Sequence, residues 1–294
     1  MNHLTIEKRV QIINLLVEGM SMRAISRVAD VSINTVTKTL EDVGTVCASY
    51  QDQTIRGVRS KRIQCDEIWG FCYAKEKNVA PESRGILGYG DVYTWTGIDA
   101  DTKLMVSYLV GKRDAEYANL FIEDLASRLS TRVQLTTDGH KPYLEAVEGA
   151  FGADVDYAML VKHYGPCSLT DQRRYSPSEF TGADKRVIVG KPEMAKVSTS
   201  FVERQNLTMR MGMRRLTRLT NGFSKKVENL EHAVSLHFMH YNFARVHKTL
   251  RVTPAMEAGL SDHVWSLEEI ANLIPMPVAQ KRGSYKPRQT AISN

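Results

Sequence analysis

The sequence predicts an α/β protein in which a mixed five-stranded sheet carries helices on both faces and an all-helical unit precedes it. Three observations point to this class. The first 43 residues place apolar side chains at helical spacing. Residues 63–110 then hold three strand-like stretches with no helical pattern between them. From residue 115 onward, helical and strand-like segments alternate, as they do in β-α-β units.

The N-terminal segment predicts three helices. Apolar side chains recur at helical spacing from Ile6, and Gly19 ends this first helix. A short helix over 21–29, a turn, and a third helix over 33–40 capped by Ser32 follow. This order is typical of a helix-turn-helix unit, whose third helix enters the DNA major groove, although plain three-helix packing modules share it. The residues expected to face DNA are Ser32, Asn34, Thr35 and Lys38.

A linker and an antiparallel meander are expected next. Residues 46–61 show little periodicity and hold several basic side chains, so they predict a basic linker. Strand-like patterns follow over 63–73, 91–99 and 104–110. The short turn at 100–103 joins the last two of these strands, so we expect three neighbouring antiparallel strands.

The following segments predict parallel strands with helical crossovers. Residues 115–129 place apolar side chains on one helical face, and a short buried strand over 133–136 comes next. Pro142 suits the first turn of another helix, and 155–161 alternates as a fifth strand. Three antiparallel strands followed by such units are the order of a ribonuclease-H-like nuclease core.

The remainder of the chain predicts a loop and two further helices. Residues 164–198 are rich in Pro, Gly, Ser and charge and are expected to form a long insertion loop. A helix begins near residue 200 and breaks at 221–222, and another runs over 224–246. The expected divisions are a helix-turn-helix domain over 1–45, the linker over 46–61, a sheet domain over 62–255, and a C-terminal helix with a basic tail over 256–294.

Three acidic residues carry the predicted chemistry. Asp66 lies inside the first strand, Asp138 just past the fourth, and Glu203 at the start of a helix. In the expected fold the first strand is central and the fourth lies parallel beside it, so these acids should converge. Carboxylate oxygens are the ligands that magnesium prefers, and two such ions can drive displacement at phosphorus. We therefore predict Asp66, Asp138 and Glu203 as catalytic residues and metal ligands.

Two neighbouring residues are alternatives or accessories. Strand alternation places Asp66 and Glu67 on opposite faces of the sheet, so only one of them is expected to join Asp138. The register favours Asp66. His140 is expected either to steer a phosphate or the attacking water, or to act as an ordinary polar turn residue.

Positive charge is concentrated in one segment. Residues 203–251 hold ten Lys/Arg and three acids, an excess of seven positive charges, and since the whole chain carries +6 the remainder carries −1. A focused basic surface is typical of a protein that binds a phosphate backbone, although a solvated helix face is the ordinary alternative. The predicted DNA contacts here are Arg204, Asn206, Arg210, Arg214, Arg215, Lys225, Lys226, Arg245 and Lys248.

Composition excludes several classes of protein. The sequence has no apolar stretch long enough to span a membrane and no signal-peptide pattern, so a cytoplasmic location is expected. Its four cysteines include no Cys-x-x-Cys pair, so neither a zinc knuckle nor a disulfide framework is expected.

Four phrases resemble a known family. They are Cys-Asp-Glu-Ile-Trp, Thr-Thr-Asp-Gly-His-Lys-Pro-Tyr, Ser-Phe-Val-Glu-Arg-Gln-Asn-Leu-Thr-Met-Arg, and the run from Tyr241 to Ala255. Together they resemble DDE transposases of the bacterial insertion-sequence-one family. The resemblance implies that Asp66, Asp138 and Glu203 are the catalytic triad. It also implies magnesium as cofactor, with manganese as a substitute, and a bacterial nucleoid as the setting. Many members carry a four-cysteine zinc finger, which this sequence lacks.

The resemblance implies a specific activity. A transposase would bind the terminal inverted repeats of its element, hydrolyse phosphodiesters at the element ends, and join each 3′-hydroxyl to target DNA. Since two ends must be brought together, a homodimer or larger assembly is expected. The alternatives are a non-catalytic helix-turn-helix regulator derived from a transposase, and a structure-specific nuclease on the same fold.

Overall fold

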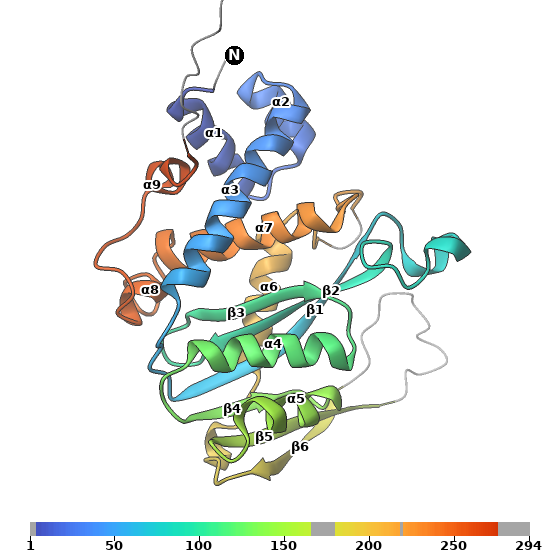
Figure 1. The fold of residues 1–294 in the computed structure, drawn as a ribbon, viewed down its shortest axis with the longest axis vertical. Helices are drawn as coiled ribbons and strands as arrows, with labels where there is room; N and C mark the ends of the chain where they lie inside the picture. Colours follow the sequence, from blue (N-terminus) through green and yellow to red (C-terminus); the bar gives the residue numbers. More distant parts are fainter. Residues whose placement is uncertain (1–3, 166–179, 218–219, 276–294) are drawn as a thin grey trace, which may run out of the picture.

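A six-stranded mixed sheet forms the centre of the protein, with helices around it (Figure 1). The computed structural model describes residues 4–165, 180–217 and 220–275. The strand order is β3-β2-β1-β4-β5-β6. The strands are β1 (Arg62–Cys72), β2 (Gly90–Asp99), β3 (Met105–Gly111), β4 (Val133–Thr137), β5 (Val155–Tyr164) and β6 (Phe180–Val189).

The first five strands follow the predicted topology. β1 pairs antiparallel with β2, and β2 with β3, so the expected meander is present. The turn between β2 and β3 is closed by Asp99, whose Oδ1 accepts the backbone N–H groups of Asp101 and Thr102. β4 lies parallel to β1 on its other side, and β5 lies parallel to β4. This mixed sheet is consistent with the expected ribonuclease-H-like fold.

The sixth strand corrects the expectation of five. β6 lies inside the segment predicted as an insertion loop over 164–198, and it pairs antiparallel with β5 from Tyr157↔Val189 to Tyr164↔Phe180. Most of its residues are exposed, because β6 is an edge strand that buries little against the protein. It therefore lacks the apolar alternation by which strands are found in sequences. The part of the predicted loop over 166–179 lies outside the described residues.

Three helices form the N-terminal part: α1 (Ile6–Val17), α2 (Met22–Ala29) and α3 (Ile33–Thr54). Each begins at a hydroxyl side chain, on Thr5, Ser21 and Ser32, that accepts the backbone N–H three residues further on. Asp30 ends α2 in the left-handed region, with φ 50°. The three predicted helices are therefore present, and the second and third begin at the predicted residues Ser21 and Ser32.

The third helix runs much further than predicted. It was expected to end at Leu40 before a linker over 46–61, but α3 continues through Thr54. Cys47 and Gln51 in this extension are buried, and the Gln51 side-chain amide donates to the backbone oxygen of Ser235 at 3.0 Å. The extension is thus stabilised by packing on a distant helix, which local periodicity does not report.

The remaining helices lie around the sheet and against the N-terminal helices (Figure 1). They are α4 (Ala115–Arg128), α5 (Pro142–Phe151), α6 (Ser200–Gly212), α7 (Val227–Met239), α8 (Pro254–Glu257) and α9 (Leu267–Asn272), and a π-helical turn over His240–Ala244 prolongs α7. Phe121 and Leu125 of α4 pack with Cys65 of β1, whereas Met209 of α6 packs with Ile68 of the same strand. The sheet therefore separates two apolar clusters. None of the described helices is long and apolar enough to cross a membrane.

Candidate functional site

Two adjacent acids on β1 face opposite sides of the sheet. The Asp66 carboxylate accepts a hydrogen bond from the Asn206 side-chain amide on α6 at 2.8 Å. The Glu67 carboxylate accepts one from the Arg113 guanidinium, on the other face, at 3.0 Å. Cys65 and Ile68 show the same alternation of side chains along β1, since they belong to the apolar clusters on the two different faces of the sheet. The predicted alternation is therefore confirmed.

Asp138 nevertheless joins both of them. One ligand oxygen from each of Asp66, Glu67 and Asp138 lies within 4.8 Å of the other two. In the described part of the chain, these three side chains form a group that could hold a metal ion. The expectation that only one of Asp66 and Glu67 could meet Asp138 is wrong. Asp138 lies in the loop after β4, where its side chain is no longer bound to one face of the sheet.

The loop after β4 is shaped around this aspartate. The backbone N–H of His140 donates to Asp138 Oδ1 at 2.9 Å, and Thr137 Oγ1 donates to the Asp138 backbone oxygen at 2.9 Å. The Arg113 guanidinium lies 3.5 Å from Asp138 Oδ2, so it bridges Asp138 and Glu67. About a third of the Asp138 side chain remains exposed, which leaves the cluster open to solvent and to a substrate.

Burial makes this cluster electrostatically costly. Removal from water, with the charge of Asp138 as the next cause, raises the pKa of Asp66 to about 6 and that of Glu67 to about 7. Hydrogen bonds from the Glu67 backbone N–H and from Asn206 only partly oppose the rise in the pKa of Asp66. A hydrogen bond with Tyr143 and the charge of Arg113 only partly oppose the rise in the pKa of Glu67. A divalent cation prefers oxygen ligands and would relieve the repulsion between the carboxylates. The donor set therefore fits a hard metal ion.

Glu203 lies beside this cluster but outside it. Its carboxylate accepts hydrogen bonds from Lys162 on β5 and from Thr199, and 41% of the side chain is exposed. Its charge contributes to the raised pKa of Asp66, so the two carboxylates are electrostatic neighbours. The helix that carries Glu203 also reaches the cluster through Asn206, one turn further on. The structure thus brings Asp66 and Asp138 together, with Glu67 as the third member of the group.

His140 is held among aromatic rings. Its ring centroid lies 5.8 Å from that of Trp95 and 6.0 Å from that of Tyr143. Burial lowers the pKa of its imidazole, and the neighbouring Arg113 adds to this effect. Its Nε2 is buried without a hydrogen-bond partner among the described residues. Its backbone shapes the Asp138 loop, while its ring packs with the core.

Most of the predicted DNA contacts are on the surface. Two of them, Ser32 and Thr35, bond to each other as the cap of α3, so their hydroxyls are engaged locally. Lys38 pairs with Asp42 on the same helix at 3.0 Å, with 74% of its side chain exposed. The exposed members of the predicted set are Ser32, Asn34, Lys38, Arg204, Arg214, Lys225, Lys226, Arg245 and Lys248.

Three other predicted contacts are engaged within the protein. Asn206 is buried and bonded to Asp66. Arg210 donates to the backbone oxygens of Trp69 and Leu216 at 3.3 Å each, and the Arg215 guanidinium donates to Ser224 Oγ at 2.7 Å. Asn206 and Arg210 share the inward face of α6, so their roles are to orient β1 and the end of the helix.

Two residues near the site were missed from sequence. Arg113 follows β3 in a Gly-Lys-Arg-Asp stretch, and Lys162 lies near the end of β5. Nothing in the local pattern marks either one. Each is brought to a carboxylate only by strand pairing, so the available signal was tertiary.

Comparisons with known proteins give a distant structural likeness. No protein-family model matches the sequence, and no curated protein matches it. Among solved structures the chain is similar to a piggyBac transposase in a synaptic complex with hairpin DNA, with 11% sequence identity. The match covers 93% of this chain and 72% of that one, with a TM-score of 0.41. A likeness this slight carries no argument about function.

Proposed function

We propose that this protein is a DNA transposase of the DDE type, related to the insertion-sequence-one family. The observation that carries the proposal is the partly buried carboxylate cluster of Asp66, Glu67 and Asp138 beside the central strands β1 and β4 of a mixed sheet. Three acids held together against their own repulsion indicate a site built for a cation. A binding-only protein has no use for such an arrangement.

Magnesium, with manganese as a substitute, is the proposed cofactor. Asp66 and Asp138 would hold it, Glu67 would support them, and Glu203 would join from α6. Bound magnesium would activate the attacking oxygen and stabilise the leaving oxygen of a phosphodiester. Glu203 can reach toward the cluster because it is on the first turn of α6 and partly exposed. That movement would break its pairing with Lys162 and leave a cation free for a DNA phosphate.

The protein's own residues would position these acids. Asn206 holds one Asp66 oxygen, which fixes the carboxylate on the α6 side of β1. Arg113 fixes Glu67 and approaches Asp138 from the other side. Residues that orient ligands in this way typically change metal affinity about 10–100-fold when they are removed.

The proposed DNA substrate would lie over the basic surface. The start of α3 would enter the major groove of the terminal inverted repeats as a helix-turn-helix, and the exposed cations after α6 would hold phosphates. Cleavage at each element end would be followed by transfer of the 3′-hydroxyl to target DNA. Two copies of the chain, or more, would be needed to hold both ends in a bacterial nucleoid.

Substitution of Asp138 by Asn tests the catalytic assignment. Loss of one carboxylate ligand should lower magnesium-dependent cleavage of DNA carrying the element ends by about a thousandfold, since metal ligands contribute several kcal/mol. End binding, measured by gel shift, should be retained. Asp91→Asn on β2 is the matched control and should cleave normally. Magnesium-dependent cleavage that survived in Asp138→Asn would show the assignment to be wrong.

One observation favours a binding-only regulator instead. The Glu203 carboxylate is engaged by Lys162 and Thr199 rather than by the acidic cluster. A regulator would shift DNA carrying the inverted repeats yet show no magnesium-dependent nicking of any end sequence. Cleavage of branched DNA regardless of end sequence would indicate a structure-specific nuclease.

A further inference from the structure

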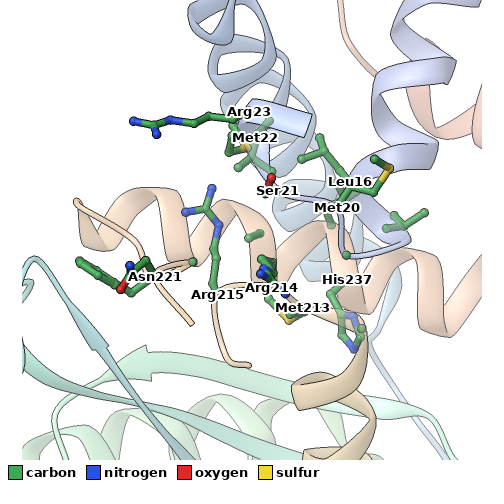
Figure 2. A pocket seen from close by; sticks show the side chains of 18 of the residues that line it. Leu16, Met20, Ser21, Met22, Arg23, Met213, Arg214, Arg215, Asn221 and His237 are labelled. Atoms are coloured by element: carbon green, nitrogen blue, oxygen red, sulfur yellow. The ribbon is translucent and has the colours of Figure 1, made fainter. Parts of the chain in front are cut away.

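A cavity of about 430 Å³ separates the N-terminal helices from the segment between α6 and α7 (Figure 2). The α1–α2 turn forms one wall, and residues 212–215 with residues 221–225 form the opposite wall. The size lies within the range of about 300–1,000 Å³ that is usual for small-molecule sites. The cavity is distinct from the carboxylate cluster, none of whose members lines it.

The inner surface of the cavity is apolar and adaptable. Met20, Met22 and Met213 come from both walls and are joined by Phe223. Thioether side chains are polarizable and fit flat aromatic ligands of varied outline. An apolar body of the size of a nucleobase would suit these surroundings.

The same cavity is lined by cations and by no acid. Arg23 comes from α2, whereas Arg214, Arg215 and Lys225 come from the other wall. None of the four forms an ion pair in the described ranges. Arg215 donates only to a serine hydroxyl, and burial lowers the pKa of its guanidinium. A partly desolvated cation without a carboxylate is costly, and an anion would compensate it.

An apolar interior with a cationic lining matches one ligand chemistry, a base joined to a phosphate. We propose that this cavity binds a single unpaired nucleotide of a DNA strand, with the base against the methionines and the phosphate on the arginines. The inference rests on the proposed function for its DNA, because Arg214, Arg215 and Lys225 are also predicted phosphate contacts of the basic surface. A strand on that surface would pass the mouth of the cavity, and removal of a base from a duplex requires such a pocket.

A fluorescent base tests the proposal without metal. The intact protein is titrated into a 15-nucleotide single strand that carries one 2-aminopurine, and in parallel into free 2-aminopurine deoxynucleoside 5′-monophosphate. Burial against the apolar interior should change the fluorescence of the strand-borne base, and the strand should bind more tightly than the free nucleotide. Equal affinity for the free nucleotide would overturn the assignment to DNA and indicate a small-molecule site.

Two variants separate the cavity from the general basic surface. Arg23→Ala should weaken the affinity for the strand about tenfold, the loss expected for one charged hydrogen bond. Arg27→Ala is the matched control, because it removes the same charge from an exposed position of α2 that does not line the cavity. Equal effects of the two would overturn the proposal. Ala233→Leu should fill the interior and abolish the fluorescence change while leaving the melting temperature within a few degrees.

The outcome is independent of the catalytic assignment. Asp138→Asn should bind the 2-aminopurine strand as the unmodified protein does, because the cavity needs no metal. Loss of cleavage in Asp138→Asn together with an unresponsive 2-aminopurine signal would refute the cavity and leave the transposase proposal in place. A fluorescence change together with undiminished cleavage by Asp138→Asn would support the cavity and refute the catalytic assignment.

Discussion

At the scale of single residues, the site is defined by the partners of its acids as much as by the acids themselves. Asp66 and Glu67 are sequence neighbours, yet each is held by a different element: Asn206 of α6 on one face, and Arg113 after β3 on the other. The Asp138 carboxylate is held within its own loop by the backbone N–H of His140. The third predicted acid, Glu203, is occupied by Lys162. The cluster is therefore pre-formed by β1 and the loop after β4, and in the proposed mechanism Glu203 would join it from α6.

Substitution of Asn206 by Ala tests this pre-formation. It removes the hydrogen bond that favours the ionised form of Asp66, so manganese affinity should fall about 10–100-fold. Binding can be measured by the loss of the free manganese signal in electron paramagnetic resonance. Leu207→Ala, at an exposed position of the same helix, should bind manganese normally. An unchanged affinity in Asn206→Ala would mean that Asp66 is oriented without α6.

His237 on α7 makes stability depend on pH. It is buried, its Nε2 has no hydrogen-bond partner among the described residues, and burial lowers its pKa from 6.5 to about 3. Below pH 6.5 the unfolded chain takes up a proton that the folded state resists, so this contribution to stability is complete above pH 6.5 and is lost as pH falls toward 3. Between pH 6.5 and 5 the loss should be of the order of 2 kcal/mol.

Urea unfolding at several pH values checks this prediction. His237→Leu removes the titrating group, so its stability should fall less between pH 6.5 and 5 than that of the unmodified protein. His263→Gln is a control in which the pH dependence of stability should change in the opposite direction, because Asp262 and Glu269 raise the pKa of that exposed imidazole. Parallel pH profiles for the unmodified protein and His237→Leu would contradict the assignment.

At the scale of elements, the contact between α3 and α7 joins the N-terminal helices to the sheet region. Gly44 permits it: a Cβ atom there would lie 2.4 Å from His232 Cβ and 2.6 Å from its Cα. The extension of α3 through Thr54 follows from this contact, because Gln51, further along the same helix, donates a hydrogen bond to the backbone oxygen of Ser235 on α7. Residues 46–54 of the segment expected to be a linker thus belong to α3.

Gly44→Ala should weaken this contact. Helix propensity alone favours alanine by up to about 1 kcal/mol. Overlap with the α7 backbone outweighs it, so we expect a net loss of about 1–3 kcal/mol in unfolding free energy by urea titration. Gly149→Ala on α5 is the matched control, since nothing lies within 4 Å of its added Cβ. It should be neutral or stabilising, and an equal loss in both variants would show that the α3–α7 contact is not tight.

At the scale of the whole molecule, α6 connects the acidic cluster to the segment that holds many of the exposed cations. The acidic cluster lies where the pairing of the central strands β1 and β4 ends. α6 leads away from it, and Arg214, Lys225 and Lys226 are exposed after the end of α6. The N-terminal helices close over this segment and create the cationic cavity (Figure 2). DNA bound to the basic surface would therefore meet the N-terminal helices and the α6–α7 segment together.

Salt dependence reports this surface. Seven predicted DNA-contacting Lys and Arg side chains are exposed, namely Lys38, Arg204, Arg214, Lys225, Lys226, Arg245 and Lys248. Each phosphate contact contributes about −0.9 to the slope of log affinity against log salt, so full engagement predicts a slope of about −6. Fluorescence anisotropy between 50 and 200 mM KCl measures it. Lys225→Gln with Lys226→Gln should make the slope shallower by about 2, and a slope near zero in the unmodified protein would rule out a backbone-binding surface.

Sequence patterns by themselves determined the N-terminal helices, the antiparallel meander, the parallel position of β4, and the meeting of Asp66 with Asp138. These are local properties, because caps, alternation and apolar periodicity act within a few residues. The segregation of positive charge into residues 203–251 was equally visible, since charge is counted without knowledge of position.

Only the tertiary structure decided the rest. β6 forms because the edge of β5 is available to pair with it, not because its own residues alternate. The end of α3 depends on α7, and the joining of Glu67 to Asp66 and Asp138 depends on a loop that lies past the strand end. The partners of the acids, from Arg113 to Lys162, are distant in sequence and carry no local signal. Each of these features follows from contacts between remote segments, and such contacts exist only once the chain has folded.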